Sequence, residues 1–301
     1  MLVIGKKYIF NEHDINQLKK LGISFEYIDE NINLNTFKKK LKKNTIIVLN
    51  NKIPISNEYL TYFTTLKLKG KKFITIDLFL EKYLKKIYIP RENINLDFLE
   101  EIKPLKKSQY IQKRILDYII GIPFFIITLP IMLYASYKIK KESPQGNIIF
   151  KQKRVGLNGK EFVCYKFRSM IPNAEVGKPE FAKKNDPRTF RWGAFMRKTR
   201  IDELPQLINV FKGEMHLVGP RPERKYWVDI FKKTIPSYDQ RHLIKPGITG
   251  WAQVNYPYGA NEYDAWQKLM YDLYYIKNWS VRLEILTLFK TIKTILKGSG
   301  L

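Results

Sequence analysis

The residues of this 301-residue chain best suited to chemistry are two adjacent carboxylates, Asp202 and Glu203, in the sequence TRIDELPQLINVFKG. Apolar residues recur after them at helical spacing, at Leu204, Leu207, Ile208 and Phe211. A short helix is therefore predicted, with Asp202 at or next to its N-cap and Glu203 in its first turn. The same pattern is common in ordinary helices, where such residues only cap the helix.

Many cationic side chains flank this acidic pair in sequence. They are Lys166, Arg168, Arg188, Arg191, Arg197, Lys198, Arg200 and Arg221. Such a group could hold an anionic substrate while a carboxylate attacks it, because positive charge must neutralise the two negative partners. A carboxylate nucleophile in phosphoryl chemistry gives an acyl-phosphate intermediate. A hard cation such as Mg²⁺ would suit oxygen ligands, since the sequence offers no cluster of histidines and cysteines.

The overall charge also points to an anionic partner. Lys and Arg number 54 against 28 Asp and Glu, a formal net charge of +26. This charge fits nucleic acid, membrane headgroups or phosphorylated substrates equally well. At 45% hydrophobic residues the chain can bury a core, which argues against global disorder. A single cysteine, Cys164, excludes an intrachain disulfide framework.

One segment has the character of a membrane helix. Residues 118–135 contain no charge and would rise about 27 Å as a straight helix, just short of a hydrocarbon core. Pro130 lies within it and predicts a kink. Basic residues lie on both sides, at Lys113, Arg114, Lys138, Lys140 and Lys141. The positive-inside rule then favours a re-entrant helix that breaks near Pro130 and returns to the same side. A straight span and a buried helical hairpin are the alternatives.

A second apolar stripe lies near the C-terminus. Ile285, Leu288, Phe289, Ile292, Ile295 and Leu296 recur at helical spacing, and Lys290, Lys293 and Lys297 lie off the stripe. This pattern fits an amphipathic helix on an anionic membrane surface. It equally fits an ordinary helix packed in a core.

The N-terminal third alternates between short apolar runs and helical patterns. The strands expected are Leu2–Ile4 or Tyr8–Phe10, Ser24–Ile28, Thr45–Leu49 and Lys72–Ile76, with helices at Asn11–Leu21 and Asn57–Leu68. This alternation predicts a small parallel α/β sheet. The segment lacks the G-x-G-x-x-G turn, so a Rossmann-like module without a nucleotide fingerprint is expected, with an interaction or regulatory role.

Three long sequence blocks follow the apolar segment in a fixed order. They are FKQKRVGLNGKEFVCYKFRSM (150–170), DPRTFRWGAFMRKTRIDELPQLINVFKGEMHLVGPRPE (186–223) and KPGITGWAQVN (245–255). Over about residues 110–301 the chain resembles the bacterial sugar transferases known as monotopic phosphoglycosyl transferases. The N-terminal module resembles the nucleotide-fold module of larger members. At Arg200 the chain departs from the family, which more often has a small hydroxyl residue there.

The resemblance implies a specific reaction. Asp202 would attack the sugar-bearing phosphorus of a UDP-sugar and release UMP, and Glu203 would assist. The sugar phosphate would then pass to a polyprenyl (undecaprenyl) phosphate, as the first membrane step of surface glycan synthesis. The residues implied to bind phosphate are Arg221, Lys166 and Arg168, with Arg197 and Arg154 as weaker candidates. Mg²⁺ would be the cofactor, with Asp202 as a ligand.

The expected architecture has three parts. An α/β module over residues 1–105 precedes a linker and re-entrant helix over 106–141 and a mainly α (α+β) catalytic domain over 142–301. The catalytic domain is expected on the cytoplasmic face of the bacterial inner membrane, and a homodimer is compatible with the sequence. A nucleotide-sugar hydrolase and a non-catalytic basic membrane or nucleic-acid binder are the competing functions. Nucleic acid is disfavoured because few aromatic residues lie between the basic residues of 138–160.

Overall fold

The structure, a computed structural model, describes residues 1–29, 32–42, 45–51, 55–90, 100–172, 174, 186–257, 259 and 261–296. The chain divides into two compact units, Met1–Tyr88 and Ile89–Leu301. This division falls earlier than the sequence-based boundary at residue 105. The reason is that Ile89 and Glu101 contact helix α11 (Glu262–Lys277) of the second unit. Trp266 Nε1 donates to the Ile89 carbonyl at 3.1 Å, and Lys277 pairs with Glu101.

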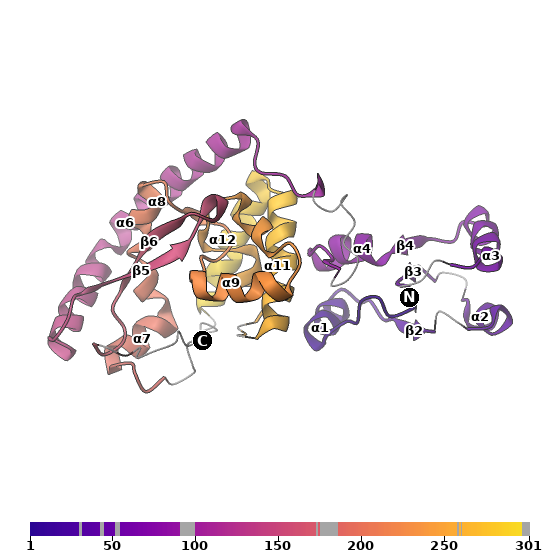
Figure 1. Ribbon diagram of the computed structural model, residues 1–301, viewed down its shortest axis with the longest axis horizontal. Coiled ribbons are helices and arrows are strands. Elements are labelled where there is room, and N and C mark those ends of the chain that lie inside the picture. The colour runs from indigo at the N-terminus through magenta and orange to yellow at the C-terminus, as the bar shows by residue number, and fades with distance from the viewer. Residues whose placement is uncertain are drawn as a thin grey trace. The chain divides into compact units, whose positions relative to one another are not determined.

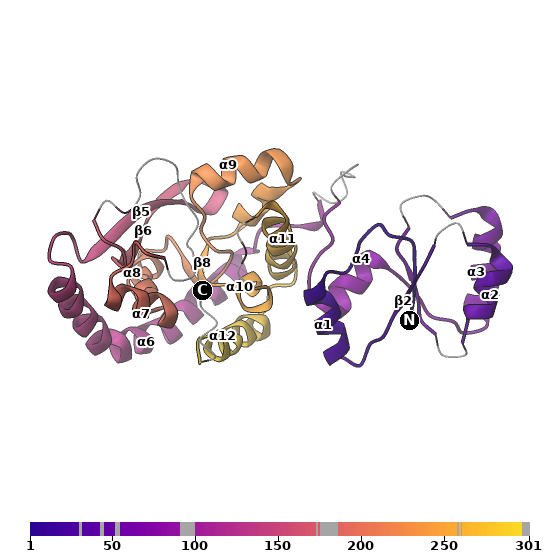
Figure 2. The ribbon, with the colours of Figure 1, turned by 90° about the horizontal axis from the view of Figure 1, so that it is seen from below.

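The first unit is a parallel α/β sheet, as predicted. Its strands are β1 (Leu2–Ile4), β2 (Glu26–Ile28), β3 (Ile47–Leu49) and β4 (Phe73–Thr75), in the order β2-β1-β3-β4. Helices α1 (Glu12–Lys20) and α4 (Ile76–Phe79), the latter continued by the π-helical turn η1 (Leu80–Leu84), lie on one face, and α2 (Leu34–Lys40) and α3 (Asn57–Leu68) on the other (Figures 1 and 2). Of the two candidates for the first strand, Leu2–Ile4 is correct.

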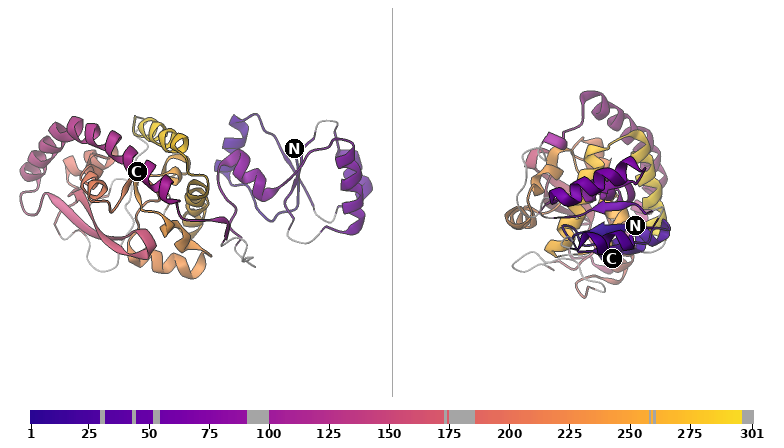
Figure 3. Two further views of the ribbon diagram at one scale, coloured as in Figure 1. Left: turned by 90° about the horizontal axis from the view of Figure 1, so that it is seen from above. Right: turned by 90° about the vertical axis from the view of Figure 1, so that its right-hand side faces the viewer.

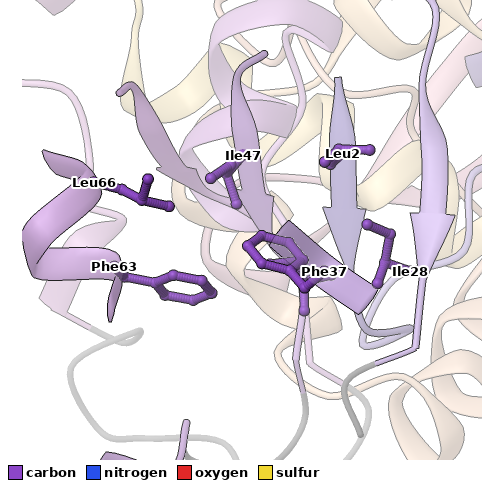
Figure 4. Packing of buried hydrophobic residues seen from close by; sticks show 7 residues of the cluster. Leu2, Ile28, Phe37, Ile47, Phe63 and Leu66 are labelled. Carbon is purple, nitrogen blue, oxygen red and sulfur yellow. The ribbon is translucent and has the colours of Figure 1, made fainter. Parts of the chain in front are cut away.

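One cluster of buried apolar residues lies between the sheet and helices α2 and α3. It contains Leu2, Ile4, Ile28, Phe37, Ile47, Phe63 and Leu66, which gather on one side of the strands (Figure 4). The helix ends follow the sequence signals: Asn11 accepts a hydrogen bond from the Asp14 amide at the start of α1, and Gly22 adopts a left-handed φ of 69° just after its end.

The second unit is mainly helical around two small pairs of strands. A long helix, α6 (Lys107–Glu142), leads into the antiparallel hairpin β5 (Ile149–Val155), η2 (Leu157–Gly159), β6 (Glu161–Phe167). Then follow α7 (Arg191–Thr199), η3 (Ile201–Glu203), α8 (Gln206–Phe211), β7 (His216–Val218), α9 (Lys225–Thr234), η4 (Tyr238–Leu243), β8 (Gly247–Thr249), α10 (Trp251–Asn255), α11 and α12 (Val281–Leu296). Strands β7 and β8 pair in parallel.

Helix α6 contains the apolar segment. Among the described residues it is the helix that is long and apolar enough to cross a membrane. The backbone stays helical through Pro123 and Pro130, so the predicted break at Pro130 is not an interruption of the helix. Both prolines lie on its exposed face, where a lost N–H can bend a helix without ending it. The helix follows a curved path along one side of the unit (Figures 2 and 3).

Only one narrow face of α6 is buried. Small residues on that face, Gly121, Thr128 and Ala135, recur every seven positions. They allow close packing: a Cβ on Gly121 would lie 3.4 Å from a ring carbon of Phe211 in α8. The opposite face exposes large apolar side chains, including Ile126 at 63% and Ile127 at 70%.

Polar residues at the start of α6 fasten it to the rest of the unit. Lys113 Nζ lies 2.5 Å from Glu284 Oε1 of α12, and both side chains are buried. Asp117 accepts a hydrogen bond from the Leu217 amide at 2.9 Å and lies 2.5 Å from Nδ1 of His216 in β7. Neither partner was foreseen from the sequence, since each lies about a hundred or more positions away.

Helix α12 has its apolar stripe on the outside. Ile285, Phe289, Ile292, Ile295 and Leu296 are exposed, whereas Leu283, Glu284 and Thr287 are buried. The alternative of an ordinary helix with this stripe in the core is therefore wrong, and Lys297 lies outside the described residues. Helices α6 and α12 lie along the same side of the unit, and α9 lies on the opposite side (Figures 2 and 3).

Candidate active site

The acidic pair lies in a tight turn between two helices. Helix α7 ends at Thr199, Arg200 adopts a left-handed conformation with φ 60°, and Asp202 and Glu203 follow in the 3-10 turn η3. The predicted capping role of Asp202 is wrong, because α8 begins after Pro205 with no side-chain cap. A positive φ at a non-glycine residue is uncommon and strained residues of this kind cluster at functional sites.

Glu203 is the centre of a cationic cluster. Its Oε1 atom lies 3.0 Å from Lys166 Nζ of β6, 3.0 Å from Arg221 Nη2 and 3.6 Å from Arg200 Nη1. Burial alone would raise the pKa of Glu203, but the charges of Arg221, Lys166 and Arg200 hold it well below its usual range. Glu203 is therefore ionised and holds three cations around one oxygen.

Asp202 has the opposite environment. It is 9% exposed, and its Oδ1 atom is buried without a hydrogen-bond partner. Burial, reinforced by the negative charge of Glu203, raises the pKa of Asp202 to about 6. A carboxylate that is desolvated and unpaired is more reactive than one in water, and a perturbed pKa of this origin is typical of functional sites. The pKa values of the two neighbouring carboxylates are thus shifted in opposite directions by their surroundings.

A buried asparagine brings the cationic strand next to the acidic turn. Asn209 of α8 accepts a hydrogen bond from the Tyr165 amide at 3.0 Å and donates to the Val163 carbonyl at 2.7 Å. These bonds attach α8, which directly follows Asp202 and Glu203, to strand β6. Lys166 is the next residue along that strand, so its side chain reaches Glu203.

The family profile described as "Bacterial sugar transferase" matches residues 108–298, which is more than half of the chain and includes this entire site. The chain belongs to the bacterial sugar transferase family. The family region begins at the start of α6, so the apolar helix and the acidic turn are parts of one family domain.

Curated relatives agree with this membership. The chain is 50% identical over 186 residues to a UDP-N-acetylgalactosamine-undecaprenyl-phosphate N-acetylgalactosaminephosphotransferase of Aeromonas hydrophila, covering 62% of this chain and 43% of that protein. It is 36% identical over 268 residues to an uncharacterized sugar transferase of Haemophilus influenzae (81% and 53%). It is 40% identical over 210 residues to an undecaprenyl-phosphate galactose phosphotransferase of Salmonella typhimurium (65% and 42%). The chain thus spans about half the length of these relatives.

The phosphate-binding candidates from the sequence fall into two groups. Arg221 and Lys166 meet at Glu203, and the charge of Arg197 is near enough to lower the pKa of Asp202. Arg168 and Arg154 do not contact the acidic pair and bind other backbone and side-chain groups instead. Arg168 donates to the Ser143 side chain and carbonyl and to the Asn147 carbonyl, and Arg154 donates to the Pro222 carbonyl.

Arg200 was not predicted from the sequence to bind at the acidic pair. It was noted as an added charge, yet its guanidinium is a member of the cluster on Glu203. The available signal was its position directly before the acidic turn.

The acidic turn offers oxygen ligands of the kind that Mg²⁺ prefers. Among the described residues no group of three or more His, Cys, Asp or Glu side chains could hold a metal. Mg²⁺ is commonly bound by one or two carboxylates together with substrate phosphates and water. The buried, partnerless Oδ1 of Asp202 fits such a single-carboxylate site.

Proposed function

We propose that this chain transfers a sugar 1-phosphate from a UDP-sugar to polyprenyl phosphate and releases UMP. The observation that supports this proposal best is the difference between the two carboxylates of the acidic turn. Asp202 is desolvated and its Oδ1 has no hydrogen-bond partner, whereas Glu203 holds three cations. The names of the Aeromonas hydrophila and Salmonella typhimurium relatives support the same substrate classes, because both contain undecaprenyl phosphate and a sugar phosphotransferase and the first also contains a UDP-sugar.

In the first step, Asp202 attacks the sugar-bearing phosphorus of the UDP-sugar. A bond forms between its carboxylate oxygen and phosphorus, the bond from that phosphorus to the bridging oxygen breaks, and UMP leaves with the electron pair. Lys166, Arg200 and Arg221 bind the substrate phosphates and offset the charge that develops between two anions. Mg²⁺ held by Asp202 would further neutralise the phosphate charge when bound.

In the second step, a phosphate oxygen of the lipid attacks the same phosphorus. The acyl-phosphate bond breaks, the Asp202 carboxylate is regenerated, and the product is a polyprenyl diphosphate sugar. Glu203 keeps the cations in place between the two steps, because it remains ionised when no phosphate is present. This order returns the site to its starting charge.

We further propose that the second unit binds the membrane from one side, on the cytoplasmic face of the bacterial inner membrane. The start of α6 is fixed by Lys113 and Asp117, and its end packs through Ala135 and Ile139 against β6 and α7. A helix whose two ends both pack on one compact unit cannot place them on opposite sides of a bilayer. The exposed apolar faces of α6 and α12, which lie along one side of the unit, then enter one leaflet.

The reaction is tested by measuring UMP release from a panel of UDP-sugars in detergent, with and without undecaprenyl phosphate. We expect Asp202→Asn to abolish UMP release, and intact-protein mass spectrometry without lipid acceptor to find a sugar-phosphate adduct on the wild type. UMP release by Asp202→Asn at the wild-type rate would reject the nucleophile. Sustained release without lipid would instead favour a hydrolase.

The topology is tested by cysteine labelling in intact cells. Cysteines introduced at positions 112 and 142 should be labelled from the same, cytoplasmic side. Labelling from opposite sides would reject the one-sided arrangement in favour of a span.

A further inference from the structure

The segment that carries Arg221 has no regular secondary structure of its own. It follows β7 as Gly219-Pro220-Arg221-Pro222-Glu223, and its two prolines have no N–H with which to join a helix or sheet. The Gly219 amide donates to the Thr249 carbonyl at 2.8 Å, and the residues that follow are held through their carbonyl oxygens.

Four consecutive carbonyls of this segment each accept a hydrogen bond, from donors in strand β5, turn η4 and strand β8. The donors are the Gly247 amide to Pro220 (3.0 Å), Arg241 Nη2 to Arg221 (3.0 Å), Arg154 Nη1 to Pro222 (3.3 Å) and the Val155 amide to Glu223 (2.9 Å). Two of the four donors are thus guanidinium groups. The carbonyl bound by Arg241 belongs to the same residue whose side chain reaches Glu203.

Arg241 is itself held rigidly. Its side chain is 7% exposed, Nη2 lies 2.9 Å from Asp272 Oδ2 of α11, and Nη1 donates to the Tyr238 hydroxyl at 2.6 Å. Because the guanidinium is planar, fixing it through Asp272 and Tyr238 also fixes the direction of the Nη2–H bond toward Arg221. A buried ion pair of this kind has a desolvation cost and contributes little stability by itself. Its place beside the Arg221 backbone therefore favours a positioning role over a purely stabilising one.

We infer that Arg241, anchored by Asp272 and Tyr238, is a positioning residue for the substrate diphosphate. It holds the backbone of Arg221 so that the Arg221 guanidinium stays at the acidic turn. The inference rests on the proposed function for the role of Arg221. Arg241 lies outside the acidic turn, and its guanidinium bonds to Tyr238, Arg221 and Asp272 and not to Asp202 or Glu203.

The test is a double-mutant cycle on the full chain in detergent, read out as the dissociation constant for UDP by calorimetry and as kcat/KM for UMP release. Arg241→Gln should weaken UDP binding about 10- to 100-fold and lower kcat/KM on the order of 100-fold. In an Arg221→Gln background the same change should cost less than about threefold, because the group it positions is gone. Arg241→Lys keeps a positive charge next to Asp272 but loses the planar guanidinium, so its UDP affinity should lie between those of the wild type and Arg241→Gln.

The control is Glu284→Gln, which disturbs a buried network in the same unit. Its Lys113, Glu284 and Trp279 side chains do not hydrogen-bond to residues 219–223. The effect of Glu284→Gln should be the same factor in both backgrounds. Equal losses for Arg241→Gln in both backgrounds, or full binding by Arg241→Gln, would overturn the inference, as would failure of the wild type to bind UDP. The expected coupling in UDP binding without any UMP release would instead reject the proposed function and keep the inference.

Discussion

Replacing Asp202 by Asn should abolish activity and at the same time stabilise the protein at neutral pH. The carboxylate is ionised at pH 7.5 although it is buried and its Oδ1 has no hydrogen-bond partner. An amide of the same shape removes the buried charge, and the Oδ1 position has no hydrogen bond to lose. Active sites commonly carry such a cost to stability.

The magnitude follows from the raised pKa. The ordinary pKa is 3.8 and that of folded Asp202 is about 6, so between these values the folded state binds more protons than the unfolded state. Stability is therefore lost as the pH rises through this window, and the full cost is present above about pH 6. At pH 7.5 it is about 3 kcal/mol, since one pKa unit corresponds to about 1.4 kcal/mol, and at pH 4.5 about 1 kcal/mol.

The assay is thermal unfolding of wild type and Asp202→Asn across this pH range. For a domain of this size about 3 kcal/mol corresponds to a rise in Tm of roughly 6–12 °C at pH 7.5, shrinking to a few degrees at pH 4.5. Glu203→Gln is the matched control with the opposite sign, because its carboxylate is stabilised by three cations. A Tm of Asp202→Asn at or below the wild-type value at pH 7.5, or a gain that is independent of pH, would refute the reasoning.

The pH profile of UMP release should fall about tenfold per pH unit below about pH 6, because protonated Asp202 cannot attack; a flat profile down to pH 5 would contradict this. Lys113→Met should lower the free energy of unfolding by about 3–5 kcal/mol, because it leaves Glu284 buried without its cation, and adding Glu284→Leu should restore most of that loss. Chemical denaturation that finds the same loss in the single and the double variant would contradict this account. Removal of divalent cations with EDTA should stop UMP release and added Mg²⁺ should restore it, whereas full activity in EDTA would reject a metal at Asp202.

Local sequence patterns predicted the four strands and the helices α1 and α3 of the first unit, but not α2 or α4. They also identified the acidic pair, although they placed it at a helix N-cap and not in the 3-10 turn where it lies. Apolar runs of three to five residues alternating with helical stripes gave the parallel sheet, and the caps at Asn11 and Gly22 marked the ends of α1. These signals are local, because strand alternation, helix period and caps each depend on residues within a few positions. The boundary of the second unit lies before residue 105 because Ile89 and Glu101 contact α11, and these contacts are not local.

The candidate site was only partly accessible to the same reasoning. Residue type and charge identified Asp202, Glu203 and a surrounding set of cations. Type and charge did not separate Arg221, which meets Glu203, from Arg168, whose guanidinium binds Ser143 and Asn147. Arg241 carried no local signal at all.

The sequence by itself therefore determined which chemical groups and structural elements are present: an acidic pair, an excess of cations, two apolar stripes and an α/β module. Tertiary structure decided how these groups are arranged. It determines which cations reach Glu203, leaves Asp202 Oδ1 without a hydrogen-bond partner, and turns the apolar stripes of α6 and α12 outward. The physical reason is that a hydrogen bond or ion pair is decided by distances of a few ångströms. Those distances arise from packing between residues that lie tens to hundreds of positions apart in the chain.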